Sequence, residues 1–420
     1  MSIFKRPAKD QRRVVVTGMG MLSPVGNNVE DSWTALISGK SGIAPITLFD
    51  ASNFDVKIAG EVKNFAIDNF VPKKEQKKMD RFIHFAVACA KMAIEDSGLK
   101  VTEENAARIG AIVGVGIGGL PMIQEQYERM KERGPTRISP FFIPAVITNL
   151  ASGQISIMHG LKGLNYSVTS ACATGAHSIG EAYNYIRNGT CLAMIAGGAE
   201  SAICELSVGG FNAMKALSTR NSDPQKASRP FDKDRDGFVI AEGGAVLVLE
   251  DMEYAKSRGA KIYGEVLGYG LSSDAYHIAS PTPDGNGAFR AMEMALRDAQ
   301  ISPDKINYIN AHGTSTPMGD EIESQAVRRL MGPHASQVWV SSTKSMTGHA
   351  LGGAGSIESV ICLKALQTGV VPPTINLEHP GEGCDLDYVP LTAREKKLNY
   401  VMNNSFGFGG TNASLIFAKI

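Results

Sequence analysis

A cysteine among small residues is the first candidate for chemistry in this sequence. Cys172 follows a short predicted strand at residues 166–169 and precedes a helical pattern at 173–187. Unpaired backbone N–H groups and the helix dipole at such a junction favour a thiolate over a thiol. The alanines and the glycine around Cys172 would let a long substrate approach closely. We therefore predict that Cys172 is a nucleophile, although a lone cysteine is more often a small buried hydrophobic residue.

Two histidines in the second half of the chain could assist such a nucleophile. His312 follows a predicted strand at residues 306–310, and His349 comes shortly after another at 338–341. Both lie in stretches rich in glycine and in hydroxyl side chains. Because histidine exchanges protons near neutral pH, two of them at strand ends indicate a catalytic site. A single histidine of this kind would more often be structural.

Two further features could belong to the same site. Lys344 lies five residues before His349, and Glu358 on the following helix could hold it in an ion pair. Residues 407–412 form a glycine-rich turn between two predicted strands, and free N–H groups there suit an oxyanion hole. Phe408 is expected to act as a gate or pocket wall. A solvated surface lysine and a plain hairpin turn are the alternatives.

Several motifs that resemble ligand sites are set aside. Residues 114–119 match G-x-G-x-x-G, but Pro121 follows and no second strand ends in an acid about 20 residues on, so a dinucleotide site is not expected. Residues 232–237 begin like a calcium loop whose twelfth position is Gly243 instead of glutamate. The sequence contains neither a P-loop nor cysteines at zinc-ligand spacing. We expect no metal and no cofactor.

The hydrophobic pattern predicts the elements that must position these residues. A helical pattern covers residues 80–96, and Gly98 would end that helix. Short β-branched or apolar segments predict strands; they lie at 13–18, 109–113, 166–169, 193–196, 238–250, 262–267, 306–310, 338–341 and 400–403. Helical patterns fill many of the gaps between them, so the predicted class is α/β.

The two halves of the sequence resemble each other at an offset of 202 residues. The helix end at 91–99 is similar to that at 293–301. In both halves a strand and a glycine-containing loop follow, and a later strand leads into a helix of small residues. Chance similarity of two amphipathic helices is the alternative, but the shared order of elements favours a duplication.

Composition restricts the expected partners. The 420 residues include 42 Lys+Arg and 42 Asp+Glu, so the formal net charge is zero. Nucleic acid and anionic membranes favour a basic excess, and neither is expected as the main partner. We find no signal-peptide pattern and no stretch of about 18 apolar residues, which predicts a soluble intracellular protein. Residues 1–11 are expected to form a mobile basic tail.

The chain resembles the chain-elongating β-ketoacyl-acyl-carrier-protein synthases of the thiolase superfamily. The resemblance lies in the segments around the cysteine, the histidines, the lysine and the glycine turn, taken together and in this order. The resemblance covers Arg13 to Ile420. It implies a thiolase fold, with duplicated α/β halves in a five-layered α/β/α/β/α arrangement. We expect the halves at residues 12–259 and 260–420. A homodimer in the cytoplasm is also implied.

The resemblance implies a condensing enzyme of type II fatty acid synthesis. Cys172 would attack the thioester of an acyl-acyl carrier protein (acyl-ACP), while the backbone N–H groups of Cys172 and Phe408 stabilise the oxyanion. Malonyl-ACP would then lose CO₂ as His312 and His349 donate hydrogen bonds to its thioester oxygen. The resulting carbanion would attack acyl-Cys172 and give 3-oxoacyl-ACP. Lys344, supported by Glu358, would order the site electrostatically.

The same resemblance implies roles in binding. Thr314 and Thr316 match positions that bind the phosphopantetheine arm, which arrives on the carrier protein. Ile117 and Phe211 match the acyl pocket, with Phe408 as its gate. Residues of a basic patch would receive the acidic carrier protein, and for each of them a solvated surface charge is the alternative; they are Lys74, Lys77, Lys78, Arg137 and Lys215.

Two other functions are possible from the sequence. A papain-like cysteine hydrolase uses cysteine, histidine and asparagine in this chain order, and Asn404 could supply the asparagine, but the sequence context of Cys172 does not match. A carrier-protein binding module or chain-length partner would bind acyl chains without condensing them. The presence of Cys172, His312 and His349 favours condensation over both.

Overall fold

Two five-stranded sheets form the centre of the molecule, in a computed structural model that describes residues 12–420. Their strand orders are β5-β4-β6-β7-β1 and β10-β9-β13-β14-β8. In each sheet the first three strands run parallel and the last two alternate in direction. The strands are β1 (Val14–Leu22), β4 (Ile109–Gly114), β5 (Asn165–Tyr166), β6 (Ala193–Glu200), β7 (Gly243–Asp251), β8 (Gly264–Ser273), β9 (Tyr308–Asn310), β10 (Trp339–Ser341), β13 (Tyr400–Gly407) and β14 (Thr411–Ala418).

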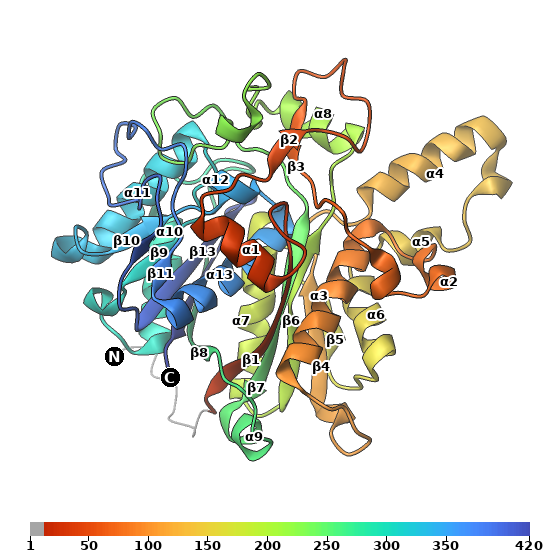
Figure 1. The fold of residues 1–420 in the computed structure, drawn as a ribbon, viewed down its shortest axis with the longest axis horizontal. Helices are drawn as coiled ribbons and strands as arrows, with labels where there is room; N and C mark the ends of the chain where they lie inside the picture. The colour runs from red at the N-terminus through yellow and green to blue at the C-terminus, as the bar shows by residue number, and fades with distance from the viewer. Residues whose placement is uncertain (1–11) are drawn as a thin grey trace.

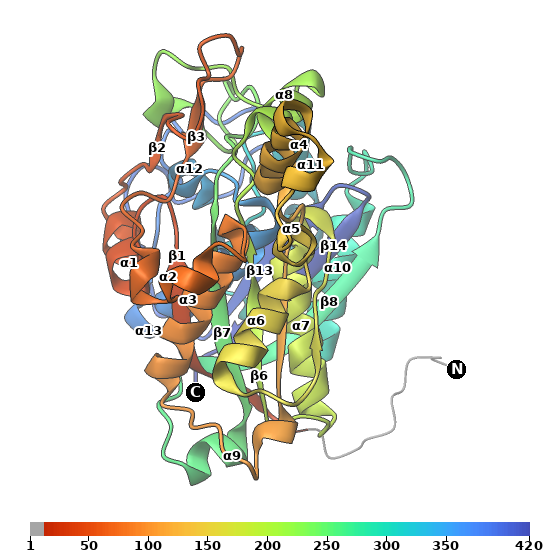
Figure 2. The same ribbon diagram turned by 90° about the vertical axis from the view of Figure 1, so that its right-hand side faces the viewer.

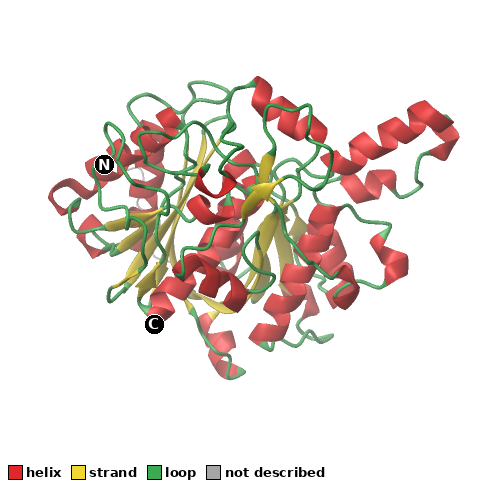
Figure 3. Ribbon diagram, turned by 45° about the horizontal axis from the view of Figure 1, so that its top comes forward, coloured by secondary structure: helices red, strands yellow, loops and turns green. Residues whose placement is uncertain are grey.

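Helices form the other three layers. Two helices lie between the sheets, and others cover each outer face, so strands and helices alternate through the molecule (Figures 1 and 3). The central helices are α7 (Thr174–Arg187) and α13 (Ala354–Thr368). The outer helices are α3 (Arg81–Ser97) and α6 (Leu150–His159) on the first sheet, and α10 (Asn286–Ala299) and α11 (Pro317–Met331) on the second. The predicted five-layered thiolase fold is confirmed.

The two sheets are joined at one edge. Val14, Val15 and Val16 of β1 pair antiparallel with Val266, Glu265 and Gly264 of β8, which makes one ten-stranded sheet. Buried apolar side chains fill the space around α7 and α13, and further clusters lie under α3 and α10. The joined sheets therefore hold the two halves in a fixed relation.

Smaller elements surround this body (Figure 2). Helix α4 (Leu120–Arg133) extends from the side that carries α5 and α6 (Figure 1). The others are α1 (Val29–Ile37), α2 (Lys73–Gln76), α5 (Phe142–Val146), α8 (Glu205–Ala213), α9 (Met252–Ser257), α12 (Lys344–Thr347), β2 (Ile43–Pro45), β3 (Ile58–Gly60), β11 (Val370–Val371) and β12 (Arg394–Glu395). No helix in residues 12–420 has the length and apolar character needed to span a membrane.

Helix α3 shows how local sequence sets an element boundary. The Asp80 side chain accepts a hydrogen bond from the N–H of Phe82 and caps the start of the helix. Gly98 ends it in the left-handed conformation, with φ 62°. Eleven of its 17 residues are buried, which agrees with the predicted helix at residues 80–96.

Three sequence predictions need correction or lie outside the structure. Only Asn165–Tyr166 of the segment around 166–169 pairs as a strand; Thr169 donates from its hydroxyl to the carbonyl of Val115 instead. The predicted strand at 238–250 begins at Gly243, because Phe238 and Ile240 make isolated bridges to other loops. The mobile tail predicted at residues 1–11 lies outside the described residues.

Candidate active site

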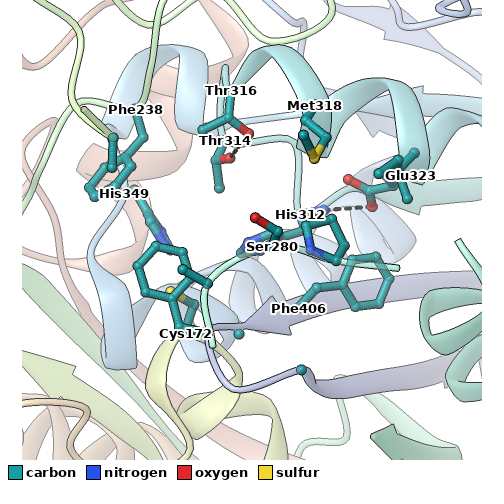
Figure 4. Close-up of a pocket in the computed structure, with 18 of the residues that line it drawn as sticks. Cys172, Phe238, Ser280, His312, Thr314, Thr316, Met318, Glu323, His349 and Phe406 are labelled. Atoms are coloured by element: carbon teal, nitrogen blue, oxygen red, sulfur yellow. Dashed lines mark hydrogen bonds between the residues drawn. The ribbon is translucent and has the colours of Figure 1, made fainter. Parts of the chain in front are cut away.

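One cavity of about 340 Å³ brings the candidate catalytic residues of both halves together. Its walls include Cys172 from the first half and His312 and His349 from the second. In Figure 4 these three side chains converge on a common space, and Thr314 and Thr316 lie above it. The cavity thus joins a thiol, two imidazoles and a hydroxyl-lined wall.

Cys172 occupies a constrained turn at the start of α7. Ala171, just before it, has φ 49°, a conformation that is unfavourable for a residue other than glycine. A 3₁₀ turn at Ala171–Ala173 follows and leads into the helix. This turn places Cys172 at the cavity wall. The residue is only 8% exposed there.

The ionisation of Cys172 differs from the sequence prediction. Burial raises the pKa of its thiol to about 12, although Lys344 and the backbone N–H groups of Phe408 and Cys172 act in the opposite direction. The expected N–H groups are therefore present, but desolvation outweighs them. Cys172 is a thiol at neutral pH, and its proton must leave as the sulfur attacks.

Backbone hydrogen bonds fix the two histidines. Glu323 accepts from the N–H groups of His312 at 2.9 Å and Gly313 at 2.7 Å. His349 donates its N–H to the carbonyl of Val239 at 2.8 Å. The two imidazole rings lie 5.4 Å apart, centroid to centroid, at 85°.

Both imidazoles are neutral. Desolvation lowers the pKa of His312 and of His349 well below the usual value, and the charge of Lys344 lowers each further. Within the described chain, Nδ1 of His312 and both ring nitrogens of His349 have no hydrogen-bond partner. A neutral imidazole carries one ring N–H, so each histidine can donate one hydrogen bond to an oxygen atom of a substrate.

Lys344 and Glu358 form a fully buried ion pair. Burial raises the pKa of Glu358 to about 7, and the ammonium group of Lys344 opposes that rise. The charge of Lys344 also favours the thiolate of Cys172 and the neutral histidines. The predicted pairing is confirmed, and the alternative of a solvated surface lysine is wrong.

The turn between β13 and β14 lies beside Cys172. The backbone N–H of Phe408 lowers the pKa of the thiol, which places that donor beside the sulfur. The rings of Phe408 and Phe211 lie 6.5 Å apart and both line the cavity. Gly409 donates to the carbonyl of Ile278, so a second loop holds this turn.

The remaining predicted binding residues divide into two groups. Thr314, Thr316 and Phe211 line the cavity, and the hydroxyls of the two threonines are 3.1 Å apart. Ile117 does not line it: its side chain is 38% exposed on the loop after β4. The structure of one chain therefore does not bring Ile117 to the other site residues.

The predicted basic patch is likewise divided. Of its five members only Lys215 lines the cavity. Lys74 and Lys77 lie exposed on and just after α2, and Lys78 contacts Glu75 and the ring of Phe141. Arg137 lies in the 3₁₀ turn after α4.

Sequence reasoning missed several residues of the site. The loop at residues 274–285 covers one side of the cavity and contributes Ser280 and Thr282. Phe238 packs edge-on against His349, with ring centroids 5.4 Å apart. The sequence contains one signal that could have identified Glu323 as a site residue. It lies three residues after Asp320, on the helix that follows the His312 loop.

The sequence matches two family descriptions in succession. Residues 11–255 match the N-terminal domain of beta-ketoacyl synthases, and residues 263–378 match their C-terminal domain. The chain belongs to the beta-ketoacyl synthase family. It is similar to curated β-ketoacyl synthases named 3-oxoacyl-[acyl-carrier-protein] synthase 2, with 56% identity to that of Vibrio harveyi and 52% to that of Synechocystis sp.. Each comparison covers 98% of this chain and 99% of the relative.

Solved β-ketoacyl synthase structures share the fold. One from Burkholderia phymatum superimposes with a TM-score of 0.91 and 36% identity, over 97% of this chain and all of the other. A type II polyketide ketosynthase solved in complex with its acyl carrier protein gives a TM-score of 0.91 and 34% identity, over 98% of this chain and all of the other.

The contacts of Asn404 do not support a papain-like hydrolase, which would need an asparagine beside a catalytic histidine. Asn404 contacts Ser414 and Glu323 instead of a histidine.

Proposed function

We propose that this β-ketoacyl synthase condenses an acyl group with malonyl-ACP in type II fatty acid synthesis. The observation that carries this proposal is the single cavity in which Cys172 meets His312 and His349. One soft nucleophile can hold the acyl group there, and neutral hydrogen-bond donors can stabilise negative charge on a second substrate.

Cys172 carries out the first half-reaction. Its sulfur attacks the acyl-ACP thioester carbon, and the N–H groups of Cys172 and Phe408 donate to the oxyanion. The intermediate expels the carrier thiolate, which takes the proton released by Cys172. An acyl-enzyme and free carrier thiol result.

The histidines act in the second half-reaction. Malonyl-ACP loses CO₂, and the N–H groups of His312 and His349 donate to the thioester oxygen that gains enolate charge. The carbanion attacks the acyl-Cys172 carbon and expels the sulfur, which regains a proton from solvent. The product is a 3-oxoacyl-ACP two carbons longer.

The carrier protein delivers both substrates. Support comes from Thr314 and Thr316 at the cavity wall, from Lys215 at the same cavity, and from the related ketosynthase that was solved with its carrier. No cofactor of the enzyme takes part in the steps above. The remaining basic residues of the patch stay a prediction.

The active form proposed for this chain is a homodimer. Apolar side chains are exposed on α4, α5 and α6, among them Tyr127, Ile143 and Ile157, and α6 contacts the edge strand β5. A second copy covering this face would also lie near the exposed Ile117 loop, which would complete the acyl pocket. The cytoplasmic location and the division at residues 12–259 and 260–420 stay predictions.

One experiment tests the chemistry. The protein is incubated with a long-chain acyl-ACP, and intact mass shows whether an acyl adduct forms on Cys172. Malonyl-ACP is then added, and 3-oxoacyl-ACP is measured. The proposal is wrong if the wild type forms no adduct, or if Cys172→Ala still forms it.

A further inference from the structure

A glycine pair stands where the duplication would place a second active site. Ala171 has φ 49° and Leu351 has φ 46°, and each begins a 3₁₀ turn that leads into a central helix. Gly352 therefore corresponds in position to Cys172. Gly116, two residues after β4, likewise corresponds to His312, two residues after β9.

The two glycines are in close contact. A Cβ atom on Gly352 would lie 2.3 Å from the backbone nitrogen of Gly116. No side chain fits between them, so this second junction has no space for a substrate. It also joins the halves, because Gly116 belongs to the first and Gly352 to the second.

Glu200, at the end of β6, closes this junction. Its carboxylate accepts hydrogen bonds from the backbone N–H groups of Gly116 at 2.8 Å, Ile117 at 3.1 Å, Gly118 at 3.2 Å and Gly352 at 3.2 Å. The side chain is fully buried. One carboxylate thus ties the loop that carries Ile117 to the first turn before α13.

The same contacts reach the wall of the cavity. Leu351, next to Gly352, lines the cavity with Cys172 and shares an apolar cluster with Cys172 and Phe211. By contrast, the His312 loop is held by Glu323 from α11, without Glu200. Each of the two loops after β4 and β9 therefore has a buried glutamate of its own.

We propose that Glu200 is a positioning residue for the acyl chain, which fixes Leu351 and the Ile117 loop relative to Cys172 without touching the reacting atoms. The inference rests on the proposed function, in which Ile117 belongs to the acyl pocket. A long acyl chain would extend along the segments that Glu200 joins, whereas an acetyl group would not reach the Ile117 loop.

The test separates chain length and half-reaction. Glu200→Gln keeps the size of the side chain but replaces one acceptor oxygen with an amide NH₂ donor that faces backbone N–H donors. Assays run at about pH 8, above the pKa of about 7 that burial gives Glu200, so that the wild type carries the charge. Cys172 acylation by long-chain and by acetyl carrier thioesters is measured by intact mass, and CO₂ release from malonyl-ACP is measured separately.

We expect the ratio of long-chain to acetyl acylation to fall by about tenfold or more, since even one methylene contact in a hydrophobic pocket changes specificity by roughly 10- to 200-fold. CO₂ release should be unchanged. Gly116→Ala, whose Cβ would meet Glu200 Oε2 at 2.5 Å, perturbs the same contact from the other side and should reproduce this pattern. It also serves as the test if Glu200→Gln does not fold.

Glu250→Gln is the matched control. Glu250 is equally buried, but it pairs with Arg258 and Thr17 away from the cavity, so its loss should not change the ratio. The proposal is overturned if the ratio is unchanged in Glu200→Gln and Gly116→Ala. It is also overturned if these variants lose long-chain acylation, acetylation and CO₂ release equally. If the wild type itself forms no acyl adduct, the proposed function fails first and the inference fails with it.

Discussion

At the scale of single residues, burial controls the chemistry of the site. Cys172, His312 and His349 all line the cavity, and desolvation by burial favours the uncharged form of each. Lys344 keeps its compensating partner Glu358, which fixes the position of the lysine's charge beside the site. The site therefore holds neutral hydrogen-bond donors around a thiol. This arrangement suits a reaction in which negative charge develops only transiently, on the oxyanion and the enolate.

His312→Ala and His349→Ala should each lower CO₂ release from malonyl-ACP by at least about a hundredfold, because each removes a donor to the enolate oxygen. Circular dichroism melts should show that both variants stay folded. Unimpaired CO₂ release in a folded variant would remove that histidine from its assigned role.

The pH dependence of CO₂ release follows from the same two residues. Because their pKa values lie well below the usual value, both stay neutral as pH falls from about 8 to about 6, where an ordinary histidine would become protonated. The two histidines should therefore contribute no transition near pH 6.5 to the rate, whereas Glu358, whose pKa burial raises to about 7, can titrate there. NMR titration of the imidazole C–H signals separates these groups, and a His312 or His349 signal with a midpoint near pH 6.5 would contradict the lowered pKa values.

Lys344→Met should destabilise the protein by about 3–5 kcal/mol, because it leaves the carboxylate of Glu358 buried without a partner. The double variant Lys344→Met/Glu358→Gln removes both charges and should recover most of that loss. Urea unfolding measures both. Equal destabilisation of the single and double variants would show that packing, not charge, is responsible.

At the scale of elements, the contact between α7 and α13 sets how the two halves of the site meet. A Cβ on Gly175 of α7 would lie 2.7 Å from the backbone nitrogen of Ser356 on α13. The absence of a side chain at this position allows the two helices to approach closely. Cys172 precedes one helix and His349 the other, so their spacing depends on that contact.

Gly175→Ala should therefore destabilise the protein by about 1–3 kcal/mol and lower kcat of condensation, since the helices must separate. Gly153→Ala in α6 is the control: its Cβ would meet only Leu150 at 3.5 Å. That change should be neutral or stabilise by roughly 0.4–1 kcal/mol. Thermal unfolding and steady-state kinetics measure both variants, and similar results for the two would refute the close-contact argument.

At the scale of the whole molecule, the surface must receive a carrier protein although the net charge is zero. Lys77→Glu should raise KM for acyl-ACP by an amount equivalent to roughly 1 kcal/mol and weaken its salt dependence, with kcat unchanged. Lys256→Glu on α9, at the lower end of the molecule in Figure 1, is the control with the same change in charge. An equal response of KM to both reversals would argue against a local patch.

The exposed apolar face predicts the oligomeric state. Ile157 on α6 is 74% exposed, and a second copy of the chain would bury it. Light scattering should show a dimer for the wild type and a shift towards monomer for Ile157→Asp, because burying a charge is costly. Ile420→Asp, at the exposed C-terminus, should leave the dimer intact. A monomeric wild type would contradict the proposed homodimer.

The sequence by itself determined the candidates and the repeat. Cys172, His312, Lys344 and His349 could be identified because their local contexts, strand ends with small or glycine neighbours, are visible in consecutive residues. Short β-branched or apolar runs likewise predicted most strands, and the helical spacing of apolar residues predicted helix α3, to within a few residues. Local features of this kind depend on neighbours in the chain, so they can be recognised without the fold.

Only the tertiary structure decided how these parts act together. The raised pKa of Cys172, the place of Ile117 outside the cavity, and the roles of Glu200 and Glu323 all depend on contacts between segments far apart in sequence. Burial is a property of the packed molecule, and it outweighed the helix N-terminus that the sequence had indicated at Cys172. The duplication was visible in the sequence, but packing made one junction a cavity and filled the other with two glycines and a glutamate.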